Sequence, residues 1–335
     1  MKIRVLGAGW YGAHIGLALR EKGHDVEVHE SADHVFAGAS GSNPARLHEG
    51  FHYPRSRLTR AFCQDHKARF LKAYGHLTRA VPINIYAIAA KDSLIDFGTY
   101  TQVLKSEVDL VSIHDPREFG LQNVEGAVLT GERHIIIRLA REYFTAALGP
   151  VLKLNTPAGS SEDTVWDWTI DCTFCALDRV DVDRYEPCIT GILGGPVNTA
   201  VTIMDGPFPS LYPWDEMYGL NSLTSAKYTP LDRCSSWLDA KKVLEATTQA
   251  QARGRVQEMF DQLVLFWPDV AKLYSIVDWK FGIRAMPRSA AAARTVDVVR
   301  IGDRLIRIRA GKIDAVFQAQ LLVEEIIDSD KDRIS

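Results

Sequence analysis

A glycine turn between a short strand and a helix is the feature that most constrains how this chain can fold. Residues 2–6 have the pattern of a buried strand, and residues 7–12 (GAGWYG) follow at once. Helical periodicity then runs over residues 11–22, and residues 25–29 form a second apolar strand that ends at Glu30. This order of strand, glycine turn, helix, strand and acid predicts a Rossmann-type βαβ unit.

The glycines and the acid of this unit have separate physical tasks. Gly7 permits the tight turn, Gly9 lets the backbone approach a pyrophosphate, and Gly12 allows the helix to pack on the strand. The pyrophosphate would meet the unpaired N–H groups and the positive dipole end of the helix. Glu30 can accept hydrogen bonds from both hydroxyls of a ribose and repels a phosphate on that sugar. The unit therefore predicts dinucleotide binding, with NADP disfavoured.

Composition is that of an ordinary globular protein. The 335 residues are enough for about two domains, and 46% of them are hydrophobic. A net charge of −3 gives no global positive field for nucleic acid or anionic lipid. Without a signal-peptide pattern, a membrane-span pattern or a disulfide framework among the five cysteines, a cytoplasmic location is expected. Cys172 and Cys175 form a CxxC that we interpret as buried structural thiols rather than redox or zinc ligands.

Beyond the first unit, helix and strand patterns alternate. We expect a Gly/Ser/Asn-rich loop over 37–44, helices over 56–78, 133–148, 238–273 and 314–327, strands over 81–90, 151–155, 165–172 and 304–309, and short β segments over 185–230. The strands at 151–155 and 165–172 could rejoin the first sheet, whereas 185–230 indicates a second, antiparallel sheet. Because no linker separates these patterns, the predicted class is an α/β fold with interleaved domains.

Three separated segments resemble the superfamily of FAD-dependent D-amino-acid oxidases, glycine oxidases and sarcosine oxidases. The first is the βαβ unit, the second is residues 37–43 (AGASGSN), similar to the family's GaSxxN segment, and the third is residues 307–313 (RIRAGKI), similar to its glycine-containing strand–turn–helix. A fourth, residues 167–173, is similar to a strand that ends in ATG or CTG in many FAD proteins. Phe174 replaces the glycine there and so removes the residue that favours a close backbone approach.

The resemblance implies a fold, a cofactor and a set of cofactor contacts. It implies a Rossmann-type FAD-binding domain over residues 1–80, 130–180 and 281–335, interleaved with a mainly antiparallel β-sheet substrate domain over 81–129 and 181–280. The residues implied in FAD binding are Gly7, Gly9, Trp10, Tyr11, Gly12, Glu30, Ser31, Ala39, Ser40, Ser42, Asn43, Thr173, Gly311, Lys312 and Ile313. No metal site is expected.

Arginines near the presumed flavin are candidates for binding a substrate carboxylate. A planar guanidinium fits a carboxylate with two parallel hydrogen bonds. Arg309 is the first candidate because glycine-oxidase-like enzymes have an arginine just before the C-terminal turn. Arg284 and Arg288 lie in a segment similar to the family's GxRp. An exposed strand face is the plainer alternative for Arg309, which alternates with apolar residues.

Aromatic and histidine residues are further candidates for the catalytic site. Tyr212 and Tyr218 come from an aromatic-rich stretch suited to line a pocket or donate a hydroxyl, with core packing or a lid as the alternatives. His52, and His48 before it, follow the loop that resembles the flavin-contacting segment. A histidine there could be a base, an oxygen-activating cation or a flavin anchor, or it could simply hydrogen-bond the loop.

These features predict FAD-dependent oxidation of a C–N bond of an amino acid or N-substituted glycine. Hydride would pass to the flavin, the imine would hydrolyse, and O₂ or another acceptor would take the electrons. A narrower version is net C–N cleavage of a glycine conjugate of a sugar or modified nucleoside. An NAD-dependent dehydrogenase is one alternative, because the βαβ unit serves either cofactor. A non-catalytic flavin-binding protein is the other alternative.

Overall fold

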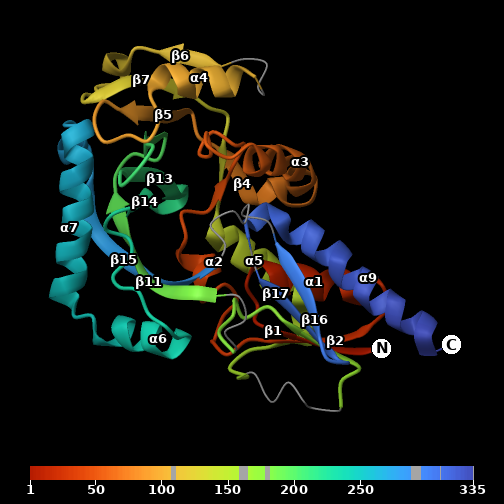
Figure 1. Cartoon of the computed structure of the whole chain (residues 1–335). Helices are drawn as coiled ribbons and strands as arrows, with labels where there is room; N and C mark the ends of the chain where they lie inside the picture. The colour runs from red at the N-terminus through yellow and green to blue at the C-terminus, as the bar shows by residue number, and fades with distance from the viewer. Residues whose placement is uncertain (107–110, 158–164, 178–181, 288–295, 310, 335) are drawn as a thin grey trace.

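Two large β-sheets and one small sheet organise the chain (Figure 1). The computed structural model describes residues 1–106, 111–157, 165–177, 182–287, 296–309 and 311–334. Its described parts contain a parallel six-stranded sheet with helices packed on it and a larger, mainly antiparallel sheet. The α/β class predicted from the sequence is confirmed.

The six-stranded sheet contains the predicted βαβ unit. Its strand order is β16 (Asp297–Ile301), β17 (Leu305–Arg309), β10 (Trp168–Asp171), β1 (Lys2–Leu6), β2 (Asp25–His29) and β9 (Leu152–Lys153). All pairs are parallel except β16 with β17. The strands predicted at 151–155 and 165–172 do rejoin this sheet, as β9 beside β2 and β10 beside β1.

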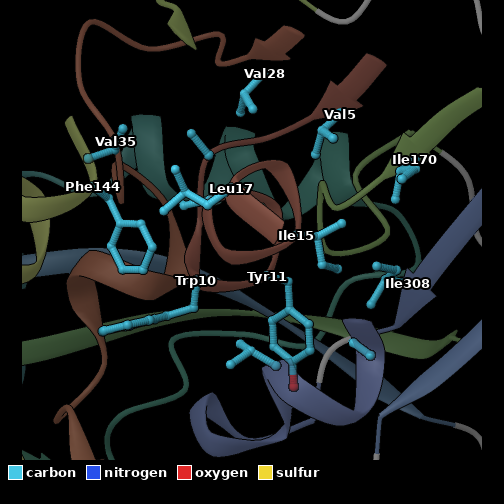
Figure 2. Packing of buried hydrophobic residues seen from close by; sticks show 14 of the residues in the cluster. Val5, Trp10, Tyr11, Ile15, Leu17, Val28, Val35, Phe144, Ile170 and Ile308 are labelled. Carbon is cyan, nitrogen blue, oxygen red and sulfur yellow. The ribbon is translucent and has the colours of Figure 1, made fainter. Parts of the chain in front are cut away.

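Helix α1 (Trp10–Glu21) is buried on nearly every side. It connects β1 to β2 and contacts α5 (Ile137–Leu148) and α9 (Val316–Ile334), which is why residues 10–19 are all buried. Figure 2 shows Trp10 and Ile15 of this helix among Val28, Phe144 and other side chains of the strands and helices around it. The helix crossover needed by two parallel strands is thus the centre of this core.

The eight-stranded sheet lies apart from the first and is flanked by α7 (Gln249–Phe266; Figure 1). Its order is β15 (Ser275–Pro287), β11 (Val182–Gly194), β14 (Leu220–Ser225), β13 (Pro209–Asp215), β12 (Thr199–Met204), β5 (Ile83–Ala89), β7 (Val124–Leu129) and β6 (Ser112–His114). Its described pairs are antiparallel apart from β12 with β5. The expectation of short segments is wrong for β11, which has 13 residues and pairs with β15 along its length.

The remaining α-helices and a small sheet come from the segments between these strands. They are α2 (Ala39–Ser42), α3 (Arg57–Tyr74), α4 (Phe97–Lys105), α6 (Trp237–Ala246), α7 (Gln249–Phe266), α8 (Val270–Leu273) and a small sheet of β3 (Arg46–Leu47), β8 (Arg133–Ile135) and β4 (Thr78–Ala80). The helix predicted from residue 133 begins only at Ile137, because residues 133–135 pair with β3 and β4. The predicted loop at 37–44 contains the one-turn helix α2.

The domain boundaries drawn from the sequence stay a prediction. Strand β15 continues within the eight-stranded sheet beyond residue 281, where the sequence places the return to the FAD-binding domain.

Among the described helices, none combines the length and the apolar character that a membrane crossing requires. The cytoplasmic location also stays a prediction.

Candidate active site

The glycine turn brings bare backbone to the N-terminus of α1. Gly7 has a φ of +90°, a conformation that L side chains rarely adopt. A Cβ at Gly12 would overlap the carbonyl oxygen of Gly7, so α1 can begin this close to β1 only without a side chain there. The first turn of α1, which the structure describes in full, contains no acidic side chain. The positive end of the helix dipole is therefore available to a diphosphate.

Glu30 and Ser40 complete the polar edge of this turn. Glu30 Oε2 accepts a hydrogen bond from the amide of Ala8 at 2.8 Å, and Oε1 accepts one from the amide of Ala32 at 3.0 Å. Ser31 Oγ donates to Oε1 at 3.2 Å. Ser40 Oγ accepts from the Trp10 amide at 3.1 Å, across the start of α1. A carboxylate, a hydroxyl and bare backbone around one helix N-terminus fit the ADP half of FAD.

Trp10 and Tyr11 direct their side chains into the protein. Trp10 is 1% exposed and stacks on Phe36 with a centroid distance of 4.9 Å, so only its backbone remains available to a cofactor. Tyr11 Oη donates to the carbonyl of Lys312 at 2.5 Å and accepts from the amide of Gly311 at 3.2 Å. Burial raises the pKa of Tyr11. This phenol ties the first helix to the C-terminal turn, two segments at opposite ends of the chain.

The loop after the acid is held by its own polar side chains. Asn43 Nδ2 donates to the carbonyl of Ala39 at 2.7 Å, and its Oδ1 accepts from the amide of Ala45 at 2.7 Å. The carbonyl of Ser42 accepts from Thr190 Oγ1 in β11 at 2.9 Å. These bonds fix α2 against the eight-stranded sheet. Their described role is to hold the loop in place, and direct contact with FAD stays a prediction.

The turn after β10 has a backbone typical of glycine although no glycine stands there. Phe174, which replaces the family's glycine, has a φ of 59°, in the left-handed region that glycine adopts without strain. Thr173 Oγ1 donates to Asp171 Oδ1 at 2.6 Å, and the Thr173 amide donates to the same oxygen at 2.9 Å. Asp171 also pairs with the buried Arg307 at 3.2 Å. A glycine-like turn is therefore kept beside the glycine turn of the first strand.

Lys312 is the buried cation of the C-terminal turn. It is 7% exposed, and its Nζ lies 2.8 Å from Cys63 Sγ and 3.8 Å from the centroid of the Tyr53 ring. Burial by itself lowers the pKa of Lys312, but the neighbouring Tyr53 and Cys63 outweigh it and raise that pKa. Ile313 is partly buried against the core of the six-stranded sheet. The turn thus contains a buried, charged lysine, and the amide of Gly311 donates to Tyr11 Oη.

The predicted substrate arginines already have carboxylate partners. Arg309 NH2 lies 2.7 Å from Asp297 Oδ2 of the neighbouring strand β16. Arg284 Nε lies 3.0 Å from Glu186 Oε2, and Arg184 binds the other oxygen of the same carboxylate. Arg288 lies outside the described residues. The two described arginines are thus held in separate ion pairs.

The predicted tyrosines lie in opposite environments. Tyr218 is 63% exposed, on a short turn after β13. Tyr212 is fully buried, accepts a hydrogen bond from Asn84 Nδ2 at 2.9 Å and stacks under Arg46 at 4.3 Å. Arg46 also donates to Thr202 Oγ1 at 2.9 Å. Tyr212 is therefore a core side chain beside a guanidinium, and Tyr218 is a surface side chain.

The structure brings together a cluster of polar side chains, only some of which were candidates from the sequence. We call His48, His52, Tyr53, Tyr86 and Glu132 the histidine–carboxylate cluster. Ring centroids are 5.5 Å apart for His48 and His52, and Tyr53 is 5.4 Å and 5.2 Å from them. Glu132 is fully buried, and Tyr86 Oη donates to its Oε2 at 2.5 Å. Burial, followed by the charge of Glu132, raises the pKa of Tyr86.

The sequence motif of residues 46–54 indicates the histidines but not their partners. Tyr86 is an ordinary strand residue of β5, and Glu132 lies in a turn before β8. Neither has a sequence neighbour that marks it as functional. Only the pairing of β8 with β3 brings Glu132 toward the loop that contains His48.

Comparison with known proteins gives relatives over nearly the whole chain. No protein-family model matches it. It is 32% identical to a protein named FAD-dependent monooxygenase FPY4 from Fusarium mangiferae, over 97% of this chain and 91% of that protein. It is 26% identical to one named FAD-dependent monooxygenase kojA from Aspergillus flavus, over 98% and 85%.

Solved structures match its fold at lower identity. Glycine oxidase from Geobacillus kaustophilus has a TM-score of 0.72 at 16% identity, over 98% of this chain and 94% of that one. Iminodiacetate oxidase from Chelativorans sp. BNC1 has a TM-score of 0.65 at 13% identity, over 98% and 95%. The arrangement of sheets described above is therefore that of these oxidases.

Proposed function

The chain belongs to the FAD-dependent oxidoreductases of the D-amino-acid oxidase superfamily, and from this premise we propose that it oxidises a C–N bond of an amino acid or N-substituted glycine. Its cofactor is FAD, so an NAD-dependent dehydrogenase is set aside. Because its relatives are oxidoreductases, a non-catalytic flavin-binding protein is set aside too. O₂ or another acceptor completes the proposed reaction.

The contact between the C-terminal turn and the histidine–carboxylate cluster carries the proposal. Lys312 of the turn covers the ring of Tyr53, which in turn contacts His48 and His52. Two imidazoles and a buried carboxylate thus lie beside the segment that we propose to hold the flavin ring. Oxidation of an amine requires that its nitrogen is neutral. Groups that accept protons next to the flavin would remove the proton from the ammonium form of the amine.

Each part of the site has a role in this proposal. FAD, when bound, supplies the acceptor for the hydride that leaves the substrate carbon. The first turn of α1 would bind the pyrophosphate, Glu30 would bind the ribose, and the C-terminal turn would hold the flavin ring. The buried side chains around Tyr53 exclude water and orient the amine.

Arg309 remains our first candidate for the substrate carboxylate. In this role its guanidinium would exchange Asp297 for the substrate. Arg309→Ala should then raise KM about tenfold for substrates with a carboxylate, because a charged hydrogen bond contributes about 1.5 kcal/mol. The bound flavin should stay in place. An amine without a carboxylate is the control, and an equal KM increase for it would remove Arg309 from the site.

An anaerobic screen of amines tests the proposed reaction. The flavin-loaded protein is mixed with amino acids, N-substituted glycines and glycine conjugates of sugars or modified nucleosides. Loss of the visible flavin band identifies a substrate, and a preference for the conjugates would support the net C–N cleavage. If no amine bleaches the flavin, the proposed C–N oxidation is wrong.

Oxygen insertion is the second candidate, favoured by the names of the curated relatives. In such a reaction one atom of O₂ enters the product, the other leaves as water, and a reduced nicotinamide supplies two electrons. Labelled dioxygen distinguishes the two reactions. Label in the product together with a requirement for reduced nicotinamide would favour insertion, whereas an unlabelled product formed without nicotinamide favours C–N oxidation.

A further inference from the structure

Glu132 is a fully buried carboxylate in a turn between two strands. Its Oε1 accepts a hydrogen bond from the amide of Glu49 at 2.8 Å, and its Oε2 accepts one from Tyr86 at 2.5 Å. The carbonyl of the same residue accepts from Asn84 Nδ2 at 3.0 Å. Burying a charge is costly unless it is paired, so these donors hold the carboxylate in one position.

His48 is the imidazole that faces this carboxylate. Its Nδ1 lies 3.5 Å from Glu132 Oε1, and its side chain keeps 18% of its surface exposed. A negative charge this close to one ring nitrogen favours the ring orientation that directs an N–H toward it and makes the other nitrogen a better proton acceptor. With Nδ1 toward Glu132, Nε2 is on the opposite side of the ring.

His48 is also connected to both segments proposed to hold the flavin. It follows α2 by a few residues, directly after β3. On its other side its ring is 5.4 Å from Tyr53, which Lys312 of the C-terminal turn covers. An amine that presents its carbon to the flavin at this point would have its nitrogen within the reach of this loop.

We propose that His48, positioned by Glu132, takes the proton of the substrate ammonium group; this role rests on the proposed function. Nε2 of His48 accepts the proton, and the electron pair of the broken N–H bond stays on the substrate nitrogen as its lone pair. That lone pair becomes the second C–N bond when the carbon gives up its hydride to the flavin, and water then hydrolyses the imine. His48 is a catalytic residue in this scheme, and Glu132 is a positioning residue.

Other titratable groups surround this pair. They are His52 and Tyr53 in the same loop, Arg46 in β3, Glu49 with its partner Lys67 of α3, Tyr86 in β5, and Lys312 of the C-terminal turn. The test therefore has to assign a titration to His48 itself.

Two variants and one matched control test the role. Glu132→Gln keeps the shape of the side chain and removes its charge, so the pKa of His48 should fall by about one unit, seen by NMR of imidazole-labelled protein. The acidic limb of the rate of anaerobic flavin reduction should move to lower pH by the same amount. His48→Asn should remove that limb and slow reduction at neutral pH about 100-fold. Rates are normalised to bound flavin, so a partly unfolded variant remains informative.

Asp215→Asn is the control, because Asp215 is also a buried carboxylate but pairs with Arg138 at 2.9 Å. In this variant the acidic limb of the flavin-reduction rate should stay at the same pH as in the wild type. A limb that stays fixed in Glu132→Gln, or that moves equally in Asp215→Asn, overturns the role of His48. If no amine reduces the wild-type flavin, the proposed function fails and the role falls with it. An acidic limb caused by protonation of the substrate's own amine would lie at the same pH in all variants.

Discussion

The glycine turn and the histidine–carboxylate cluster are both polar regions of the proposed site, but they are assembled in opposite ways. The turn uses backbone groups and one acid from residues 7–32, which are close in sequence. The cluster uses side chains from the loop after β3, from β5 and from the turn before β8. A site made of backbone depends on local spacing, whereas a site made of buried side chains depends on how distant strands pair.

The strongest test of the backbone-built region is Gly12→Ala. The new Cβ would overlap the carbonyl oxygen of Gly7, which is backbone and cannot turn away. We expect a loss of about 3 kcal/mol in the free energy of unfolding and loss of bound FAD. Urea unfolding and flavin content measure both effects. Gly254→Ala in α7, with nothing within 4 Å of the new Cβ, is the control and should stabilise by up to about 1 kcal/mol.

A buried histidine in α1, the helix that follows the glycine turn, gives the second test. Burial lowers the pKa of His14 in α1 from 6.5 to about 4. Between these values the unfolded chain binds a proton and the folded chain does not, so stability falls as pH falls through this window. From pH 7 to pH 5 the loss due to His14 should be about 2 kcal/mol.

His14→Gln should remove that part of the pH dependence, measured as the difference in urea unfolding between pH 7 and pH 5. His34→Gln, at an exposed side chain, is the matched control and should keep it. A His14→Gln protein with the full wild-type pH dependence would show that this histidine is protonated in the fold.

Glu30→Gln tests the acid of the glycine turn. A neutral amide binds ribose hydroxyls more weakly than a carboxylate, so the Kd for FAD should rise about tenfold. Glu27→Gln is the control, because Glu27 lies in β2, just before Glu30, but pairs with His29 at 2.8 Å. Equal FAD affinity in wild type and Glu30→Gln would contradict the ribose contact.

The smallest expected effect is at Phe174, where a side chain occupies a glycine-like backbone. Phe174→Gly and Phe174→Ala both lose the ring, but only alanine keeps a Cβ at a φ of 59°. The glycine variant should therefore be more stable than the alanine variant by about 1 kcal/mol in thermal or urea unfolding. A more stable alanine variant would mean that the backbone at this turn relaxes.

The sequence predicted the elements whose determinants are local, and it missed those fixed by pairing. The strand, turn and helix of residues 2–22 were readable because glycine spacing and apolar periodicity are set within a few residues. Residues 133–135 read as the start of a helix, since no local signal shows that β3 and β4 pair with them. The ion pairs of Arg284 and Arg309 could not be predicted from the sequence either. Glu186 is distant in sequence from Arg284, and Asp297 lies on a separate strand from Arg309.

By itself the amino-acid sequence determined the glycine turn and its acid, which we propose to bind the nucleotide, because a backbone site needs only the right residues at the right spacing. The tertiary structure decided which side chains share the proposed substrate site. Glu132 meets His48 because two short strands pair, and Tyr11 meets Lys312 because the first and last helices pack on the same sheet. Contacts of this kind follow from the burial of distant apolar faces, which fixes neighbours that no short segment encodes.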